Sequence, residues 1–397
     1  MSRNESSHDL GRERSGARNR TLASGWGRAP WGLLGMLALV AAVELFWVRD
    51  NLGITSDQAL SWKYAGRRAE RRARGCEVLC FGDSLVKMGV MPRILGRELG
   101  CRAFNLALYN GPAPASYFLL RRAVRAGARP SAVVVDFVAG ILAEGPRSKA
   151  RPYDWPDLLS PGEALDLAWS ARDADLFARV LVGEVFPSVR RRFEVRGLLM
   201  AALEGRDLGH KRHARYLLWN WDTNDGAHLN LPRQAPELAA PPGGPPQPGT
   251  WRCDPVNERY HRRFLDLAAA HRIAVYWLLP PLHPTWQASM EYQGEDARFT
   301  AFVRALRDRY PDVVVVDGRH SGFERTAFVD PVHLNPAGAT ACTTALAEVI
   351  ARHAHGGSVA PRWVKLPDYR TTLARSVENG SGVSRKSLEP SIRVRRR

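Results

Sequence analysis

Ser84 lies in the stretch LCFGDSLVKMG, residues 79–89, where a short apolar run passes directly into Gly-Asp-Ser. Gly, Asp and Ser are all common in turns, so these three residues alone do not distinguish a nucleophile from an ordinary turn. A serine hydroxyl becomes an effective nucleophile only beside a general base. The rest of the chain must therefore supply a base, an acid that orients the base, and donors for an oxyanion.

A second polar stretch, FVDPVHLNPAG at residues 328–338, contains both a base and an acid. Asp330 and His333 are three residues apart on one predicted turn, and this spacing lets the carboxylate hold the imidazole and fix its tautomer. The Asn-Pro pair at 335–336 is typical of the start of a helix. Ser84, His333 and Asp330 are therefore the candidates for nucleophile, base and orienting acid. A turn serine, a helix-start histidine and a turn aspartate are the alternatives.

Candidate oxyanion donors lie in the loop YNGPAP, residues 109–114. Gly111 has no side chain, so its backbone N–H can approach a developing oxyanion closely. The Ser84 N–H is a second candidate donor, and the Asn110 side chain is a third. A plain turn is the alternative interpretation of Gly111 and Asn110.

Five apolar runs alternate with helical patterns and predict an α/β fold with a mostly parallel, five-stranded sheet. The predicted strands are residues 76–81, 101–108, 131–137, 274–281 and 312–318, and the predicted helices are 92–99, 115–128, 254–273, 296–310 and 336–354. Ligands of open α/β sheets bind beyond the carboxyl ends of the strands. Ser84, Gly111 and His333 all follow predicted strands, so we expect the sheet to bring them to one edge.

The alternation stops after the third predicted strand, and residues of about 138–250 predict a helical insertion. Its last part, 235–249, is rich in Pro and Gly and is typical of a linker. The aromatic rings of YLLWNWDTND, residues 216–225, could stack on sugars or pack in a core. His283 follows the fourth predicted strand, where it would line the site or lie in an exposed loop.

The stretch APWGLLGMLALVAAVELFWV, residues 29–48, predicts a transmembrane anchor. Its length is about what a helix needs to cross a bilayer, and Trp31 and Trp47 lie near its ends. The basic residues of 1–28 place the N-terminus in the cytoplasm and the rest of the chain outside, in the periplasm or extracellular space. A cleaved signal peptide and a buried core helix are the alternatives.

The chain is therefore expected to contain a basic cytoplasmic tail (1–28), the anchor (29–48), a connector (49–74), one α/β domain (75–356) and a basic, disordered tail (357–397). The formal net charge is +17, but most of the excess lies in 1–28, 63–74 and 358–397 rather than in the α/β domain. With no zinc finger, P-loop or RNA-binding motif, this charge pattern predicts no nucleic-acid partner.

The chain has five cysteines, and their spacing matches no metal site. Cys76 and Cys80, four residues apart in or beside one apolar strand, are typical of small buried hydrophobic residues. The sequence does not assign a disulfide partner to Cys253. We expect no metal and no cofactor.

The blocks FGDSL (81–85) and DPVHLN (330–335) together resemble the first and last sequence blocks of the SGNH, or GDSL-type, hydrolase superfamily. The resemblance covers about residues 75–356 without the insertion. It implies a flavodoxin-like three-layer α/β/α fold and a triad of Ser84, His333 and Asp330. It also implies a role for Gly111 in the oxyanion hole and no cofactor.

One block departs from this resemblance. The superfamily usually has an Asn after the third strand as an oxyanion donor, whereas this chain has Asp136 in VVVDFVAGILAEG. The insertion and the anchor are similar to the surface-polysaccharide O-acetylation branch, which includes the alginate acetylation proteins. We therefore expect a serine esterase or O-acyltransferase acting on acyl esters of cell-surface carbohydrate. The alternative is a catalytically inactive surface protein that binds glycan through the same groove.

Overall fold

The computed structural model describes residues 31–49, 55–148, 154–205, 210–231, 251–356 and 360–371, and it divides into two units, Met1–Phe46 and Trp47–Arg397. The predicted cytoplasmic tail, the Pro/Gly-rich stretch 235–249 and most of the predicted C-terminal tail lie outside the described residues.

The first unit contains most of helix α1 (Trp31–Arg49), which falls on the predicted anchor. Large apolar side chains along this helix are exposed, among them Trp31, Leu34, Leu37 and Val40. Within the described ranges, no helix meets the combined requirement of length and apolar character for crossing a bilayer.

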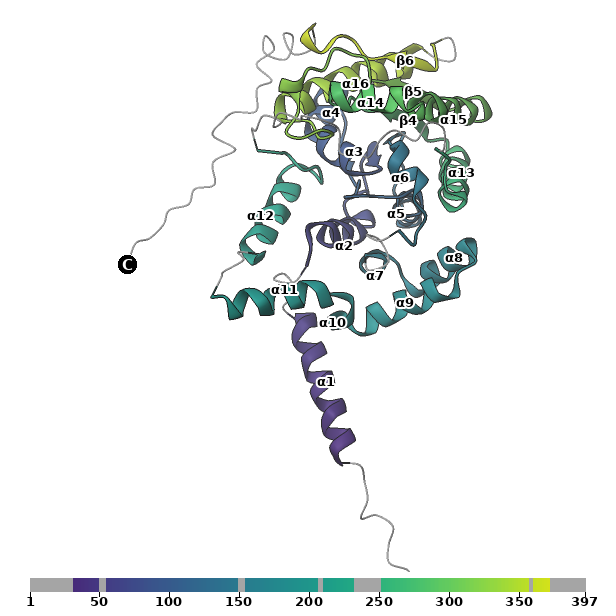
Figure 1. Ribbon diagram of the computed structural model, residues 1–397. Helices are drawn as coiled ribbons and strands as arrows, with labels where there is room; N and C mark the ends of the chain where they lie inside the picture. The colour runs from purple at the N-terminus through teal and green to yellow at the C-terminus, as the bar shows by residue number, and fades with distance from the viewer. Residues whose placement is uncertain are drawn as a thin grey trace, which may run out of the picture. The chain divides into compact units, whose positions relative to one another are not determined.

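The second unit is built on a parallel sheet with the strand order β2-β1-β3-β4-β5-β6, as Figure 1 shows in part. The strands are β1 (Val78–Phe81), β2 (Ala103–Asn105), β3 (Ala132–Val135), β4 (Ala274–Leu279), β5 (Val313–Asp317) and β6 (Trp363–Lys365). β1, β3 and β4 are runs of apolar residues, many of them β-branched or aromatic, that are buried along most of their length. The predicted α/β class with a parallel sheet is confirmed.

The prediction of five strands was wrong, because β6 adds a sixth at the edge beside β5. This strand lies in the segment expected to be disordered. It has three residues and a proline on either side, Pro361 and Pro367, so it shows no apolar periodicity. What fixes it is tertiary packing, since Leu366 and Tyr369 are buried against the core.

Helices cover both faces of the sheet, and each face has its own apolar core. One face packs against α2 (Asp57–Ala69), α5 (Ala113–Arg125), α13 (Pro255–Ala270) and α15 (Glu295–Arg309), and the other packs against α3 (Ser84–Gly89), α4 (Pro92–Leu99) and α16 (Pro336–Gly356). α14 (Pro284–Tyr292) and the short helix η2 (Arg325–Ala327) follow β4 and β5.

Helix α2 is part of this body, although its residues were expected only to connect the anchor to the domain. Ser56 caps its N-terminus, and Trp62 is fully buried, with its indole N–H donating to Tyr109 O at 2.9 Å. The same ring meets Trp155 edge to face at 4.9 Å. α2 is therefore held rigidly enough to carry functional side chains.

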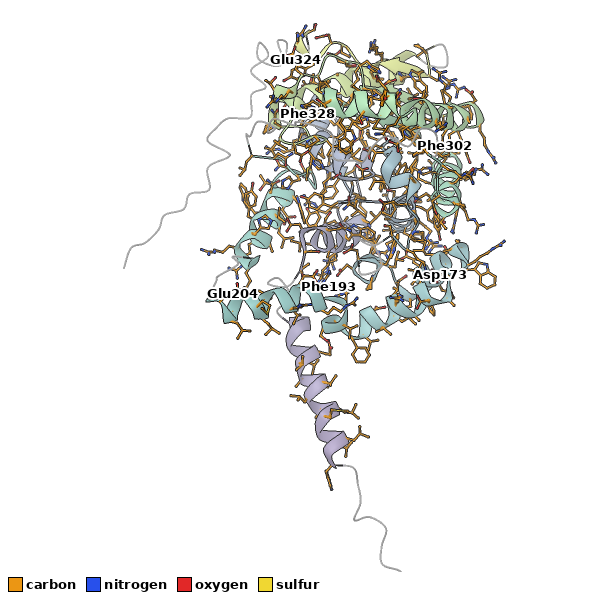
Figure 2. All side chains as sticks on the ribbon, in the orientation of Figure 1. Asp173, Phe193, Glu204, Phe302, Glu324 and Phe328 are labelled. Atoms are coloured by element: carbon orange, nitrogen blue, oxygen red, sulfur yellow. The ribbon has the colours of Figure 1, made fainter. Side chains whose placement is uncertain are left out.

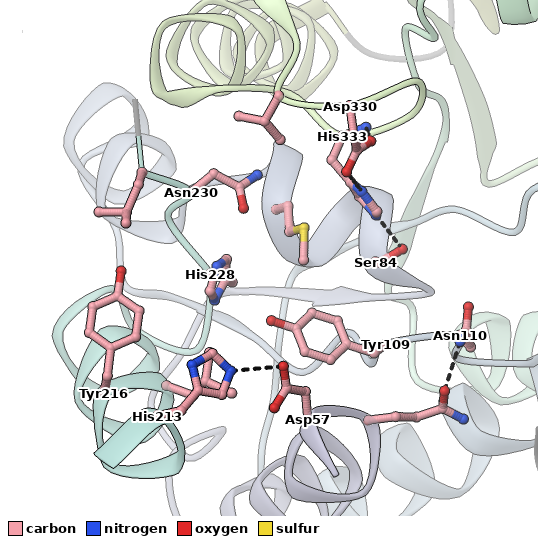
Figure 3. A pocket seen from close by; sticks show the side chains of 15 residues that line it. Asp57, Ser84, Tyr109, Asn110, His213, Tyr216, His228, Asn230, Asp330 and His333 are labelled. Carbon is pink, nitrogen blue, oxygen red and sulfur yellow. Dashed lines mark hydrogen bonds and ion pairs between the residues drawn. The ribbon is translucent and has the colours of Figure 1, made fainter. Parts of the chain in front are cut away.

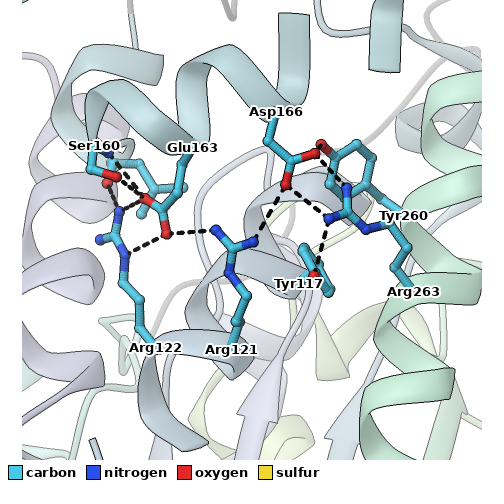
Figure 4. Close-up of polar contacts among 9 residues, drawn as sticks. Tyr117, Arg121, Arg122, Ser160, Glu163, Asp166, Tyr260 and Arg263 are labelled. Carbon is cyan, nitrogen blue, oxygen red and sulfur yellow. Dashed lines mark hydrogen bonds and ion pairs between the residues drawn. The ribbon is translucent and has the colours of Figure 1, made fainter. Parts of the chain in front are cut away.

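The predicted insertion between the third and fourth strands contains α6 (Ala139–Ala143), α7 (Trp155–Leu158), α8 (Pro161–Ala171), α9 (Ala174–Val185), α10 (Pro187–Arg190), α11 (Arg192–Leu203) and α12 (His210–Thr223). An ionic network ties α8 to the core helices α5 and α13 (Figure 4). Arg122 donates to Glu163 at 3.0 Å, and Arg263 donates to Asp166 at 2.8 Å. Burial raises the pKa of Glu163, but the hydrogen bond and charge of Arg122 outweigh it and hold that pKa below its ordinary value.

Candidate active site

Ser84 stands at the first position of α3, directly after the carboxyl end of β1. Asp83 caps this helix, and its Oδ1 accepts from Leu85 N at 2.7 Å. Gly82 has φ +122, and a Cβ at this position would overlap Asp136 Oδ1, so the turn requires glycine. The Gly-Asp-Ser sequence therefore makes a tight strand-to-helix turn that presents the serine at the sheet edge.

Asp136 directly follows β3, and its carboxyl group contacts the backbone of this turn. Its Oδ1 accepts from Asp83 N at 3.0 Å, and both carboxyl groups are buried. Burial raises the pKa of both groups, and the neighbouring Asp83 raises that of Asp136 further. Because two buried carboxylates repel each other, the pair is most stable when it shares one proton. The residue that follows the third strand, Asp136, thus contacts the nucleophile turn directly.

The three predicted catalytic residues form one chain of hydrogen bonds (Figure 3). His333 Nε2 is 2.8 Å from Ser84 Oγ, although the two residues are 249 positions apart. His333 Nδ1 is 2.7 Å from Asp330 Oδ2. The imidazole thus lies between the hydroxyl and the carboxylate, within reach of both.

Asp330 is fixed by the loop that carries it. Its Oδ1 accepts from the backbone N–H groups of Val332 and His333 at 2.9 and 2.8 Å, which leaves Oδ2 for the imidazole. Burial raises the pKa of Asp330, but the hydrogen bond and charge of His333 outweigh it, so the pKa lies below its ordinary value. An ionised Asp330 is an acceptor only, so it sets the proton of His333 on Nδ1 and leaves Nε2 free to act as a base.

Ser84, Asp330 and His333 line a cavity of about 940 Å³ (Figure 3). We call these three residues the sheet-edge wall. The other side of the cavity, which we call the helical wall, comes from α2, α12 and the segment after α12. It consists of Asp57, Gln58, His213, Tyr216, His228 and Asn230. Among the described residues that line this cavity there is no Lys or Arg.

The helical wall has its own histidine and carboxylate. His213 Nε2 on α12 is 2.9 Å from Asp57 Oδ2 on α2, and about half of each side chain is exposed. His228 accepts from Trp221 Nε1 at 3.1 Å through Nδ1. Burial, followed by the charges of Lys87 and His333, lowers the pKa of His228 to about 3. His228 is therefore neutral with its proton on Nε2, and can donate one hydrogen bond.

Lys87 connects the two walls. It lies three residues after Ser84 and is fully buried, and its Nζ donates to Gly226 O at 2.9 Å and lies 4.6 Å from the centre of the Trp221 ring. The Lys87 carbonyl accepts from His228 N at 2.8 Å. Burial lowers the pKa of Lys87 to about 7. Helix α3 is thus tied directly to the segment after α12.

The candidate oxyanion donors have different surroundings. Gly111 packs against the nucleophile turn so closely that a Cβ there would overlap Gly82 O. Asn110 adopts φ 51 and lines the cavity, and its Nδ2 donates to Gln58 Oε1 at 2.8 Å. One of its two amide hydrogens is therefore already engaged, and the use of Gly111 and Asn110 as donors stays a prediction.

Comparison with protein-family models and with curated protein sequences finds no match for this chain. The resemblance to the SGNH hydrolases therefore stays a prediction that depends on the FGDSL and DPVHLN blocks.

The structure also places His283 and the aromatic rings of residues 216–225. His283 neither lines the cavity nor lies in an exposed loop: it is buried, its Nδ1 caps α14 by accepting from Thr285 N at 3.3 Å, and its ring contacts Phe328. Of the rings in residues 216–225, Tyr216 lines the cavity, whereas Trp221 is buried in the core.

Sequence reasoning missed most of the helical wall. Asp57 and His213 are 156 residues apart and lie on surface positions of two different helices. No local spacing links them. The signal that was available is the Ser-Asp pair at 56–57 ahead of an amphipathic run, which is typical of a capped helix packed on a core.

Proposed function

We propose that this chain is a serine esterase or O-acyltransferase of the SGNH type that forms an acyl-enzyme on Ser84. The observation that carries this proposal is the chain of hydrogen bonds from Ser84 through His333 to Asp330 at 2.8 and 2.7 Å. This is the arrangement that a nucleophile, a general base and an orienting acid require. The proposal includes the flavodoxin-like three-layer fold of that superfamily.

In the first step Ser84 Oγ attacks the acyl carbonyl while its proton passes to His333 Nε2. The resulting oxyanion would receive hydrogen bonds from the Ser84 and Gly111 amides. The carbon–oxygen bond to the alcohol then breaks, and His333 returns the proton to that alcohol. In the second step His333 deprotonates water or another alcohol, which attacks the acyl carbon of acyl-Ser84. The bond from that carbon to Ser84 Oγ then breaks, His333 returns the proton to Ser84 Oγ, and the acid or a new ester leaves.

The helical wall would bind the alcohol part of the substrate. It offers hydrogen-bond acceptors at Asp57, donors at His228 and Asn230, and the ring of Tyr216. With no Lys or Arg on the cavity lining described, this set suits an uncharged polyhydroxyl compound better than a phosphate or a polyanion. Acylated carbohydrate is therefore the proposed substrate class.

The proposal also places the chain at a membrane through residues 29–48, with the catalytic unit on the outer side. Its support is the apolar sequence of this segment and the basic residues before it. Protease protection in sealed vesicles tests it: cleavage of the α/β unit from the outside supports this topology, and cleavage from the cytoplasmic side contradicts it.

Active-site labelling tests the catalytic proposal. A fluorophosphonate probe should label the wild-type chain, and both Ser84→Ala and His333→Ala should abolish the labelling. Ser188→Ala, at a serine in α10 away from the cavity, is the matched control and should label as the wild type does. A folded wild-type chain that takes no label would contradict the enzyme and favour a glycan-binding protein.

A further inference from the structure

The helices of the insertion carry an apolar surface that faces solvent. Apart from α1, most of the exposed large apolar side chains among the described residues lie on α8 to α11. They are Leu165, Trp169, Val182, Val185, Phe186, Val189, Phe193, Leu199, Met200 and Leu203. A concentration of exposed apolar side chains on neighbouring helices usually marks a binding face.

The surface follows three consecutive helices. α9, α10 and α11 run one after another along one side of the second unit (Figure 1). Their inward positions are filled by a different set of residues, namely Leu176, Val180, Gly183, Pro187, Arg191 and Ala201. The helices therefore present their exposed apolar residues on a face other than the buried one. We call the row from Val182 to Leu203 the apolar strip.

Helix α11 shows the character of the strip most clearly. Phe193, Met200 and Leu203 are seven and ten residues apart, so they share one face, and they are 61%, 48% and 82% exposed (Figure 2 labels Phe193). Arg192 and Arg196 lie on the same side, and the Arg192 guanidinium lies 4.6 Å from the centre of the Phe193 ring. Apolar and aromatic residues interleaved with arginines are typical of a helix that lies in a bilayer interface.

We infer that the apolar strip docks on the surface of a phospholipid bilayer. The strip is the outer face of a row of helices rather than the lining of a groove, so it fits a flat, extended partner. A second apolar segment of the same chain supports this partner. Seven residues join the end of α1 to the start of α2, and they reach about 25 Å at most. A bilayer that took up the apolar α1 would therefore lie close to the catalytic unit.

The exposed apolar side chains of the strip determine how strongly the strip should bind to vesicles. Burial of large apolar side chains favours binding to a bilayer, and interfacial helices bury theirs only in part. Three side chains together should still change the partition of the chain into vesicles by at least about tenfold.

Vesicle flotation tests the inference with the full chain. Leu34→Arg, Leu37→Arg and Val40→Arg together make α1 polar, so that α1 no longer dominates binding. This chain should still float with vesicles of phosphatidylcholine and phosphatidylglycerol. Adding Phe193→Gln, Met200→Gln and Leu203→Gln should reduce the bound fraction at least about tenfold. Trp219→Gln and Tyr292→Gln, at exposed rings outside the strip, are the matched control and should leave binding as it was.

Three results would overturn the inference. The chain with polar α1 could fail to float, or the strip variant could float as well as its parent. The third is a dimer, detected by sedimentation without vesicles and lost in the strip variant, which would assign the strip to a second copy. Glutamine favours helices, and the substituted side chains are exposed, so cooperative unfolding at the wild-type temperature verifies that each variant is folded.

Discussion

The two walls of the cavity each contain a histidine hydrogen-bonded to an aspartate, yet they differ in how the pair is held. On the sheet-edge wall, Asp330 and His333 belong to one turn, and two backbone amides fix the carboxylate. On the helical wall, Asp57 and His213 come from two helices and are each about half exposed. Among the described residues, the first pair has a serine at the second imidazole nitrogen, since Ser84 Oγ is 2.8 Å from His333 Nε2.

The role of a histidine–aspartate pair depends on the group that the second imidazole nitrogen contacts. A rigid pair beside Ser84 can move a proton with little reorganisation, which is what a general base needs. An exposed pair that meets no nucleophile can exchange water for a substrate hydroxyl. The sheet-edge wall is therefore suited to chemistry and the helical wall to binding.

The largest expected effect is at Asp330. Asp330→Asn should lower kcat for ester turnover by about 10³–10⁴-fold with little change in KM, because an amide no longer fixes the His333 tautomer or stabilises the imidazolium. Steady-state kinetics on an activated acetyl ester measure it. Asp57→Asn, the matching change on the helical wall, should not produce a loss in kcat of this size. Similar losses in kcat for both variants would contradict the division of roles.

A smaller effect is expected at His213. His213→Ala should raise KM for an acylated oligosaccharide by about tenfold, since one hydrogen bond to a charged or polarised group contributes about 1–3 kcal/mol. His320→Ala is the control, because His320 forms a similar exposed pair with Glu291 at 3.2 Å outside the cavity. A fall in kcat with an unchanged KM would move His213 from binding to chemistry.

The sheet-edge wall could be predicted from the sequence, and the helical wall could not. Ser84, His333 and Asp330 each lie in a short motif at the end of a predicted strand, and parallel topology brings such ends together. Asp57 and His213 meet only because α2 and α12 pack on the same body, and such packing leaves no local pattern. The same is true of β6, which tertiary contacts hold between two prolines.

Lys87 offers a test of the connection between the walls. Burial lowers its pKa from 10.5 to about 7, so the unfolded chain holds this proton more tightly than the folded chain does. Stability should therefore fall as the pH falls from about 10 to 7, by at most about 1.4 kcal/mol per pH unit from this group.

Chemical denaturation of the wild type and of Lys87→Met across this pH range measures the effect. The wild type should lose unfolding free energy relative to Lys87→Met as the pH falls from about 10 to 7, because methionine has no ionisable proton. Lys365→Met, at an exposed lysine on β6, provides a matched control for the loss of a lysine side chain. If the difference in unfolding free energy between the wild type and Lys87→Met does not change with pH, burial has not lowered the pKa of Lys87. The buried contact of its side chain with the segment after α12 would then be contradicted.

The smallest effect is expected at Asp136, beneath the sheet-edge wall. Because burial raises the pKa of Asp83 and Asp136, the folded pair keeps a proton that the unfolded chain releases near pH 4. The stability contributed by this proton is complete below pH 4 and is lost as the pH rises through the raised pKa. Asp136→Asn should keep the acceptor for Asp83 N and replace the shared proton with an amide hydrogen.

The variant should therefore fold with a stability within about 1 kcal/mol of the wild type and lose less stability than the wild type as the pH rises above 4. Thermal unfolding across pH 4–9 measures this difference. Asp136→Ala removes the acceptor for Asp83 N and should lower stability at every pH. If Asp136→Asn and the wild type lose stability in parallel, the two carboxyl groups share no proton. The hydrogen bond from Asp83 N to Asp136 Oδ1 would then hold the nucleophile turn without a shared proton.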